Sequence, residues 1–348
     1  MDMAVRPASL VDDREQLLGL LERNFPGTQS HFRWRHEENP AGQGWSWVLY
    51  DRADGAIRGM ASVLPRPMYV YGRSVLCGQV GEFAVDATHR SLGPAVMLQR
   101  VMFGPVDSGE LAVCYDCPPD QRGMSPFVRL GMQPRCRLIR YVALLRIDEV
   151  VARILGAAAW TKPLVRSGNL LLNTRRQNHQ VAGLEISVLS GWFGDEFTYL
   201  DQIVPSSGVI RASRAAELLN WRFRRRNGIR SGDVDVVLAR KRGELLAFLA
   251  FSVDKNGRAS IHDLFGCKLR EVGLPLLTAA LEMCRRKKLI SLEAYCSESS
   301  ELKPFFEAAG FRARERDVRV VAYSKSDSCA SGSNSNPMWN VGPAELYP

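Results

Sequence analysis

Hydrophobic and polar residues recur along the chain with two different periodicities, one typical of strands and one typical of helices. Residues 5–24 begin as a strand and continue with leucines at helical spacing, which predicts an amphipathic helix. Residues 32–40 then predict a short helix that ends at Asn39-Pro40. Strands are predicted at 45–50 and 59–64, with a hairpin turn at Asp54-Gly55 between them. A further strand at 68–71 leads through Gly72-Arg73 to a central segment.

The central segment, residues 81–102, changes from a β-prone alternation to apolar residues at helical spacing. The change predicts a strand, a tight loop and the start of a helix. Small residues at a helix start leave backbone N–H groups and the positive end of the helix dipole open, which suits a phosphate or pyrophosphate. The segment has neither the Gly-Lys-Ser/Thr of a P-loop nor a GxGxxG dinucleotide fingerprint.

The junction reads Arg90-x-x-Gly93-x-Ala95, with Val85 before it, and it resembles the Arg/Gln-x-x-Gly-x-Gly/Ala signature of the GNAT acyltransferases. Two further blocks follow in the order of that family. Residues 111–115 read as its fifth strand, and residues 125–132, from Ser125 to Met132, resemble its closing helix and Gly-Phe turn.

The same order of parts returns in the second half. Residues 219–223 echo residues 32–36, both around a Trp-Arg pair. Residues 234–239 and 245–253 predict a hairpin turned at Arg242-Gly243, followed by a strand at 261–266, a loop at 270–275, a helix through Cys284, a strand at 289–295 and a closing helix at 304–311. We therefore predict two tandem GNAT-like domains of α+β or α/β class, each a mixed, mostly antiparallel twisted sheet flanked by helices.

The expected boundaries are 1–146 for the N-terminal, cofactor-binding GNAT domain, 147–178 for a helical linker and 179–348 for the C-terminal GNAT-like domain. The linker is amphipathic and ends in Arg175-Arg176. It either lies on a membrane surface or packs across the two halves, and packing is the interpretation we favour. Residues 325–336 read as a mobile loop, and residues 339–347 as a final strand.

Composition narrows the class of protein. A length of 348 residues suits two domains, and the start of the chain shows no secretory signal. No window approaches 18 uncharged apolar residues, so no membrane span is expected. Eight cysteines without a signal indicate reduced thiols and a cytoplasmic protein, and Cys114-x-x-Cys117 lacks the second pair that zinc would need. The net charge of +9 is compatible with an anionic cofactor, nucleic acid or acidic lipid.

The GNAT resemblance implies an acyl-CoA donor, most often acetyl-CoA, and no metal. It implies that the loop holds the pyrophosphate of coenzyme A, that backbone groups of the preceding strand meet the pantetheine, and that Asp120 stands where the family often has an Asn that touches the cofactor arm. The expected cofactor-binding residues are Phe83, Ala84, Val85, Arg90, Ser91, Leu92, Gly93, Pro94, Ala95, Asp120 and Phe127.

Acyl transfer to an amine requires a proton acceptor and a proton for the leaving thiolate. Glu82 precedes the loop and is the expected base, directly or through water, with a pKa raised by burial. The alternative role for Glu82 is a salt bridge to an arginine. In the family a Tyr often protonates the thiolate, but its position holds Phe127 here and Phe306 in the second half. Tyr115 is the expected substitute, and Cys117 and His89 are weaker candidates.

The second half departs further from the pattern. Pro275 replaces the last small residue of the loop and removes an N–H group, and His262 stands where Glu82 would be. His262-Asp263 is either an acid–base pair or contains a satisfied, partly buried histidine. We therefore expect the cofactor in the first half, and a degenerate second half that shapes the acceptor site.

Three functions remain open at this point. The first is a coenzyme A-dependent N-acyltransferase whose acceptor is the amine of a small molecule; tandem GNAT-like proteins with a Trp-Arg before the first hairpin resemble those found with bacterial surface-polysaccharide genes, which favours an amino sugar. The second is a Fem-like transferase that uses aminoacyl-tRNA, with which the net charge of +9 is compatible. The third is a non-catalytic binding protein. No residue pattern indicates the oligomeric state.

Overall fold

The computed structural model describes residues 2–27, 29–118, 121–129, 134–155, 163, 165–168, 181–224, 234–325 and 338–339. The first half follows the predicted order. Its elements are β1 (Met3–Pro7), α1 (Arg14–Asn24), α2 (Gln29–His36), β2 (Trp45–Asp51), β3 (Ile57–Val70), β4 (Arg73–Val85), the 3₁₀ turn η1 (Ala87–His89), α3 (Leu92–Val101), α4 (Gly104–Asp107), β5 (Cys114–Asp116), α5 (Gln121–Arg129) and β6 (Pro134–Leu144).

The second half has a similar series, with an additional strand, β8, between its first two helices after β7. After α6 (Asp148–Leu155) it contains β7 (Leu184–Val188), α8 (Asp195–Ile203), β8 (Val209–Ala212), α9 (Ala216–Phe223), β9 (Val234–Lys241), β10 (Glu244–Val253), β11 (Arg258–Gly266), α10 (Leu269–Arg286), β12 (Ser291–Ser297), α11 (Lys303–Ala308), β13 (Arg312–Tyr323) and β14 (Met338–Trp339). The hairpin predicted at Arg242-Gly243 is confirmed, with both residues at positive φ.

The strands predicted at 59–64 and 68–71 are parts of one strand, β3, which runs through Pro65 and Pro67. Both prolines pair with β4 on one edge. On the other edge of β3, pairing with β2 ends at Val63 and pairing with β8 begins at Met68, so the two prolines lie between these partners. Because no strand of the described chain pairs with that stretch of the edge, the missing N–H groups break no ladder.

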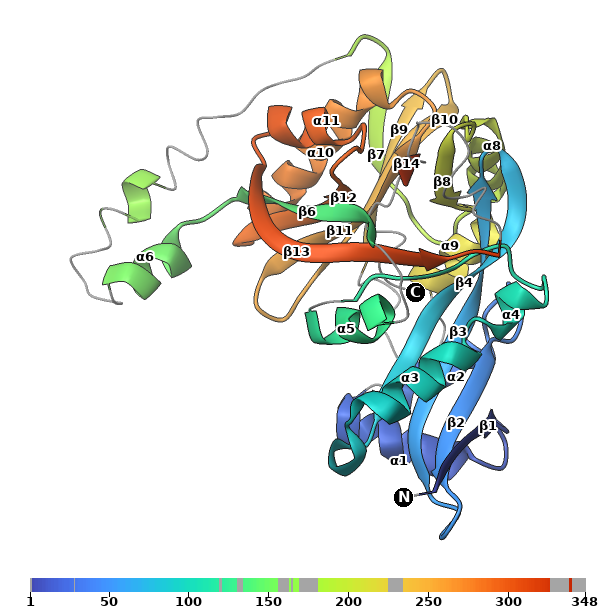
Figure 1. Ribbon diagram of the computed structural model, residues 1–348. Helices are drawn as coiled ribbons and strands as arrows, with labels where there is room; N and C mark the ends of the chain where they lie inside the picture. The colour runs from blue at the N-terminus through green and yellow to red at the C-terminus, as the bar shows by residue number, and fades with distance from the viewer. Residues whose placement is uncertain are drawn as a thin grey trace.

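Within the described residues, the sheets of the two halves are joined into one mixed, mostly antiparallel sheet of 14 strands. Its order is β1-β2-β3-β4-β5-β13-β6-β12-β11-β10-β9-β7, with β8 on β3 and β14 on β8. The last strand of each half has therefore crossed over: β13 pairs with β5 of the first half, and β6 pairs with β12 of the second. β6 and β13 also pair with each other and lie side by side at the centre of the molecule (Figure 1).

Two equivalent tryptophans join the halves at a second place. The rings of Trp34 on α2 and Trp221 on α9 stack with centroids 4.7 Å apart. Each indole N–H donates a hydrogen bond to the backbone carbonyl of the other residue, at 2.8 and 2.9 Å. This reciprocal contact brings together the two Trp-Arg segments noted in the sequence.

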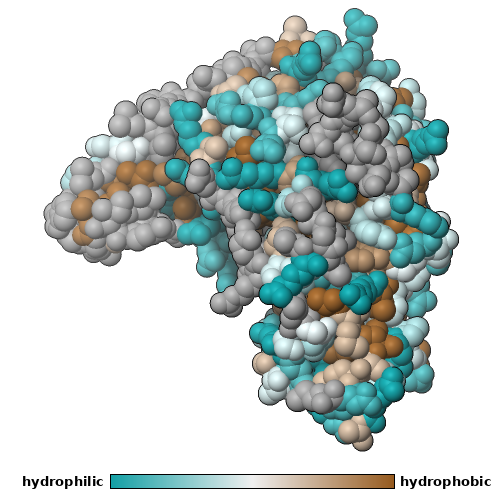
Figure 2. Space-filling view, in the orientation of Figure 1, coloured by the Kyte–Doolittle hydropathy of each residue, from teal (hydrophilic) through white to brown (hydrophobic). Residues whose placement is uncertain are grey.

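The linker is described only in part. Figure 1 shows α6 to one side of the sheet rather than across the two halves, and the space-filling view shows apolar side chains on this arm (Figure 2). Leu155 at its end is 44% exposed. Most of residues 156–180, the loop at 326–336 and the stretch after Trp339 lie outside the described residues. In the described chain, no helix has both the length and the apolar character needed to cross a membrane.

Candidate active site

The candidate active site begins with a bulge in β4. Ala61 pairs with Phe83 and Val63 with Val80, so the single residue Ser62 faces two residues of β4, Gly81 and Glu82. A Cβ atom at Gly81 would lie 2.5 Å from Ser62 Oγ, closer than side chains tolerate, which is why a glycine occupies this position. A bulge turns the side chain that follows it, and here it turns that of Glu82 towards α2.

Glu82 lies at the centre of a buried polar cluster. Arg35 Nη1 donates to its Oε1 at 2.7 Å, and His36 Nε2 lies 2.9 Å from its Oε2. Ser62 Oγ donates to Oε2 and accepts the Glu82 backbone N–H, both at 2.8 Å. Glu82 is 6% exposed and His36 1% exposed. The sequence analysis identified Glu82 but assigned no role to Arg35, His36 or Ser62. The charged residues at the end of the helix that contains the Trp-Arg pair could have indicated Arg35 and His36.

The ionisation of Glu82 differs from the expectation. Burial by itself raises the pKa of this carboxyl, as predicted, but the hydrogen bond and charge of His36 and those of Arg35 oppose burial and hold the pKa well below its usual range. The expected direction was therefore wrong. At neutral pH Glu82 is a carboxylate that keeps a proton on His36 Nε2. His36 Nδ1 is buried and has no hydrogen-bond partner in the described chain.

Next to this cluster, β4 and β5 separate. They are parallel partners through Gly78 with Cys114 and Gln79 with Tyr115, and no pair follows. From there, among the described strands, β5 pairs with β13 alone. We call the point where the two strands part the β4–β5 fork. The stretch Phe83, Ala84 and Val85, expected to meet the pantetheine, follows directly on β4 and is paired on its other edge with β3.

The predicted loop follows β4 and opens α3. Ser91 precedes the helix with no side-chain hydrogen bond to cap it, so the first N–H groups of α3 are uncapped by that residue. A Cβ atom at Gly93 would meet nothing within 4 Å, and Gly93 is exposed. Arg90 has a structural role: its Nε donates to Val85 O at 3.1 Å and its Nη2 to Asn24 Oδ1 at 2.5 Å, which fastens the loop to the end of β4.

The candidates for the thiolate acid lie apart. Tyr115 is 1% exposed and packs with Met68, Leu138 and Val320 on one face of the sheet. Phe127 packs on the other face, in a cluster that includes Cys114 and Leu98. His89 contacts Thr88 in the loop, Cys117 is partly buried after β5, and Asp120 lies outside the described residues. Tyr115 is thus not on the face where the family pattern would place its tyrosine.

The second half contains a neutral counterpart of the Glu82 cluster. His262 lies next to a register shift between β10 and β11, and its Nε2 is 2.6 Å from Ser252 Oγ. The ring of Phe223, which follows the Trp-Arg pair as His36 does in the first half, lies 6.2 Å away. Burial and the charge of Arg222 lower the pKa of His262 to about 4, so it is uncharged at neutral pH. Asp263 pairs with Arg214 instead.

The second loop differs from the prediction. α10 begins at Leu269, so residues 270–275 form its first turns rather than a loop before it. Gly273 is buried, and a Cβ atom there would lie 3.5 Å from the Phe305 ring. The earlier start follows from the short connection, Cys267-Lys268, between β11 and α10. A phosphate cannot approach Gly273 as it can Gly93.

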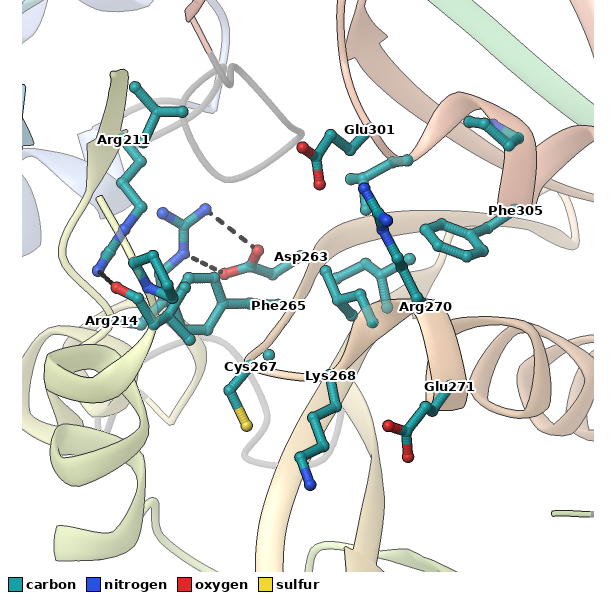
Figure 3. A pocket seen from close by; sticks show the side chains of 18 of the residues that line it. Arg211, Arg214, Asp263, Phe265, Cys267, Lys268, Arg270, Glu271, Glu301 and Phe305 are labelled. Atoms are coloured by element: carbon teal, nitrogen blue, oxygen red, sulfur yellow. Dashed lines mark hydrogen bonds and ion pairs between the residues drawn. The ribbon is translucent and has the colours of Figure 1, made fainter. Parts of the chain in front are cut away.

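A pocket of about 970 Å³ nevertheless lies at the end of β11 and the start of α10 (Figure 3). Its buried arginines are occupied by carboxylates: Arg214 by Asp263, and Arg211 by Asp201. Lys268, Arg270, Glu271 and Glu301 are exposed around it. The mixture of charges gives this pocket no clear preference for an anion.

Comparison with known proteins agrees with this architecture. Residues 4–115 match the family described as "Acetyltransferase (GNAT) domain". No curated protein matches the chain. A probable N-acyltransferase from Enterococcus faecalis V583 has a TM-score of 0.65 at 10% identity, over 92% of this chain and 72% of that one. Saccharomyces cerevisiae N-myristoyltransferase with bound myristoyl-CoA has a TM-score of 0.62 at 12% identity, over 93% and 79%.

A third structure is that of a fungal multi-domain β-N-acetylglucosaminidase with a GCN5-related glucosamine N-acetyltransferase region. It has a TM-score of 0.57 at 11% identity, over 92% of this chain and 38% of that one. Residues 4–115 thus match a GNAT domain, and the fold of the described chain is similar to that of the N-acyltransferase structures.

Proposed function

We propose that the protein is an acyl-CoA-dependent N-acyltransferase whose reaction takes place at the β4–β5 fork of the first half. The observation that carries the proposal is the succession of three features along β4 and the segment after it: the fork, the bulge at Glu82, and the start of α3, which Ser91 does not cap. An extended thioester lying along β4 would have its pyrophosphate at Ser91–Ala95 and its acyl group near Glu82.

The proposed donor contacts are those of the sequence analysis. Ser91, Leu92, Gly93, Pro94 and Ala95 present the start of α3 to the pyrophosphate, with Arg90 holding the loop. Phe83, Ala84 and Val85 present backbone groups to the pantetheine, and Phe127 and Asp120 complete the donor site. The division into units at 1–146, 147–178 and 179–348 also remains a proposal, and so does a cytoplasmic location.

The chemistry follows from the charge of Glu82. A neutral amine attacks the thioester carbonyl, so the ammonium form must first lose a proton. Ionised Glu82 attracts that ammonium, whose proton leaves through water, because the free nitrogen of His36 is buried and His36 Nε2–H holds the carboxylate. Glu82 thus acts in the proposal as a charged group that guides the amine rather than as the free base first expected.

The proposed donor is acetyl-CoA and the proposed acceptor an amino sugar. The glucosamine N-acetyltransferase among the structural relatives supports this acceptor class, and the myristoyl-CoA complex supports an acyl-CoA donor. The second half supports an accessory role, because its equivalent histidine is neutral and its glycine is covered by Phe305.

The test is calorimetric titration with acetyl-CoA. The wild-type protein is expected to bind, and Gly93→Glu is expected to abolish binding because it places a carboxylate at the pyrophosphate position. Gly104→Glu is the matched control, since Gly104 is equally exposed at the start of α4 and a Cβ atom there also meets nothing within 4 Å.

Three outcomes are decisive. Loss of binding in Gly93→Glu alone supports the donor site. Unchanged binding in Gly93→Glu places the donor elsewhere in the chain. No binding by the wild type overturns the acyl-CoA proposal, and binding of an aminoacyl-tRNA by the same protein would then identify a Fem-like reaction.

A further inference from the structure

Asp116 is a carboxylic acid at the candidate site to which the proposed chemistry assigns no role. It ends β5, and its side chain is half-buried. Its Oδ1 accepts the backbone N–H of Cys117 at 2.7 Å, and no ion pair reaches it from the described part of the chain. A partly buried carboxyl without a cationic partner is uncommon, because ionisation in such a place is costly.

The strand register places Asp116 at the fork. Gln79 and Tyr115 are the last parallel partners of β4 and β5. The next residues, Val80 and Asp116, are the first on either side of the separation. The bulge at Gly81 and Glu82 follows immediately on β4. On its other edge Asp116 pairs with Val321 of β13, which fixes the backbone of the acid.

The alternation of side chains gives Asp116 its face of the sheet. Successive residues of a strand point to opposite faces, so Asp116 shares the face of Cys114 and not that of Tyr115. Cys114 belongs to the cluster that contains Leu98 of α3 and Phe127 of α5. Asp116 is therefore on the face of Phe127, the position where the GNAT pattern has a tyrosine that this chain lacks.

The charge state of Asp116 suits proton donation. Burial raises its pKa to about 7, so a large fraction of the molecules carry the proton at neutral pH. The ionisable groups on the same face are Cys114 on β5, Arg319 and Tyr323 on β13 and Arg129 on α5. Tyr323 is hydrogen-bonded to Asp107, and burial raises the pKa of the Cys114 thiol.

We propose that Asp116 is the acid that protonates the sulfur of coenzyme A when the acyl group leaves. The inference rests on the proposed function. The nitrogen that attacked gives its surplus proton to solvent, and as the tetrahedral intermediate collapses the C–S bond breaks and its electron pair passes to sulfur. The Asp116 O–H bond breaks, its proton joins that sulfur, and the products are the amide, the free thiol and an aspartate that solvent reprotonates.

The first experiment observes the contact directly. Protein labelled with ¹³C at the aspartate carboxyl carbon is titrated with coenzyme A and with desulfo-coenzyme A, which has the same phosphates but no sulfur. The Asp116 signal is assigned by its absence in Asp116→Asn. Coenzyme A is expected to shift this signal, and desulfo-coenzyme A to leave it near its position in the free protein.

The second experiment separates proton donation from contact. Turnover of acetyl-CoA and of p-nitrophenyl acetate is compared with glucosamine as acceptor. Asp116→Asn is expected to slow the acetyl-CoA reaction about 100-fold, the scale of general acid catalysis. The p-nitrophenyl reaction should change little, since that leaving group departs without a proton. Asp195→Asn, at an exposed aspartate of α8, is the control.

The failures are distinguishable. Equal shifts with the two ligands, no shift with coenzyme A, or equal slowing with both donors would overturn the role of Asp116 while the donor site stands. Absence of coenzyme A binding by the wild-type protein would overturn the proposed function and this inference with it. A merely structural aspartate would slow both donors alike.

Discussion

Glu82 and Asp116 flank the β4–β5 fork, and their surroundings shift the pKa values of the two carboxyls in opposite directions. Both are removed from water, which favours the neutral acid. Glu82 has Arg35 and His36 within hydrogen-bond distance and stays ionised, whereas the described residues offer Asp116 a single backbone N–H, that of Cys117. Two carboxyls with separated pKa values can divide the roles of charged group and acid between them.

The first prediction at the residue scale is that removal of the Glu82 charge lowers the free energy of unfolding. Glu82→Gln leaves Arg35 and His36 buried without their partner, and a buried ion pair that loses one member costs about 3 kcal/mol. Urea denaturation at pH 7 measures the loss, with Glu282→Gln, an exposed glutamate of α10, as the control. A loss equal to that of the control would contradict the buried cluster.

The difference in stability between the wild-type protein and Glu82→Gln should depend on pH. Because the folded-state pKa of Glu82 is lowered, its stabilisation is complete above the unfolded-state value of about 4.3 and declines as the pH falls further towards the folded-state value. The difference in unfolding free energy between wild type and Glu82→Gln should therefore be constant from pH 7 to 5 and shrink below that.

The sequence predicted which positions lie at the site more readily than it predicted their ionisation or the direction of their side chains. Glu82 was identified from its place before the loop, but its ionisation depends on Arg35 and His36, which lie 46 to 47 positions away in the chain. Asp116 was passed over because a lone Asp after a short strand carries no motif. Tyr115 was favoured for its chemistry, although strand alternation points it away from Phe127.

At the scale of elements, most helices and hairpins followed from apolar spacing and turn residues. The β4 bulge did not, because one slipped residue leaves no periodic signal. The start of α10 was also misplaced, since Gly273 and Pro275 look like loop residues when the length of the preceding connection is unknown.

Two glycines of the site should respond differently to alanine. Gly81→Ala pushes a methyl group against Ser62 Oγ and is expected to destabilise the fold by about 1–3 kcal/mol. Gly93→Ala meets open space near the start of a helix and should be neutral or stabilising by up to about 1 kcal/mol. Thermal unfolding of both variants is the measurement, and equal effects would contradict the bulge geometry.

At the scale of the whole molecule, the internal repeat was visible in the sequence but the exchange of final strands was not. Each of β6 and β13 reads as an ordinary strand that closes its own half. Nothing in their alternation specifies that β6 joins β12 and β13 joins β5. The partner of a strand depends on the edges that the rest of the fold leaves open.

The exchange predicts that neither half folds by itself. Residues 1–146 would lack the β13 partner of β5, and residues 179–348 would lack the β6 partner of β12. Separately produced halves should show no cooperative unfolding transition, whereas their mixture should regain one and bind acetyl-CoA. Circular dichroism and calorimetry check this. A well-folded, ligand-binding 1–146 fragment would contradict it.

The position of β13 in the chain also determines how long after β5 its partner strand is synthesised. Val321, which pairs with Asp116, follows it by 205 residues. At roughly 5–20 residues per second, β5 is made roughly 10–40 s before its neighbour exists. During that interval the nascent first half carries an unpaired sheet edge beside the fork, an edge open to other chains. The strand ends at the proposed site are thus paired only after β13 has been made, so premature termination before residue 312 would leave that site incomplete.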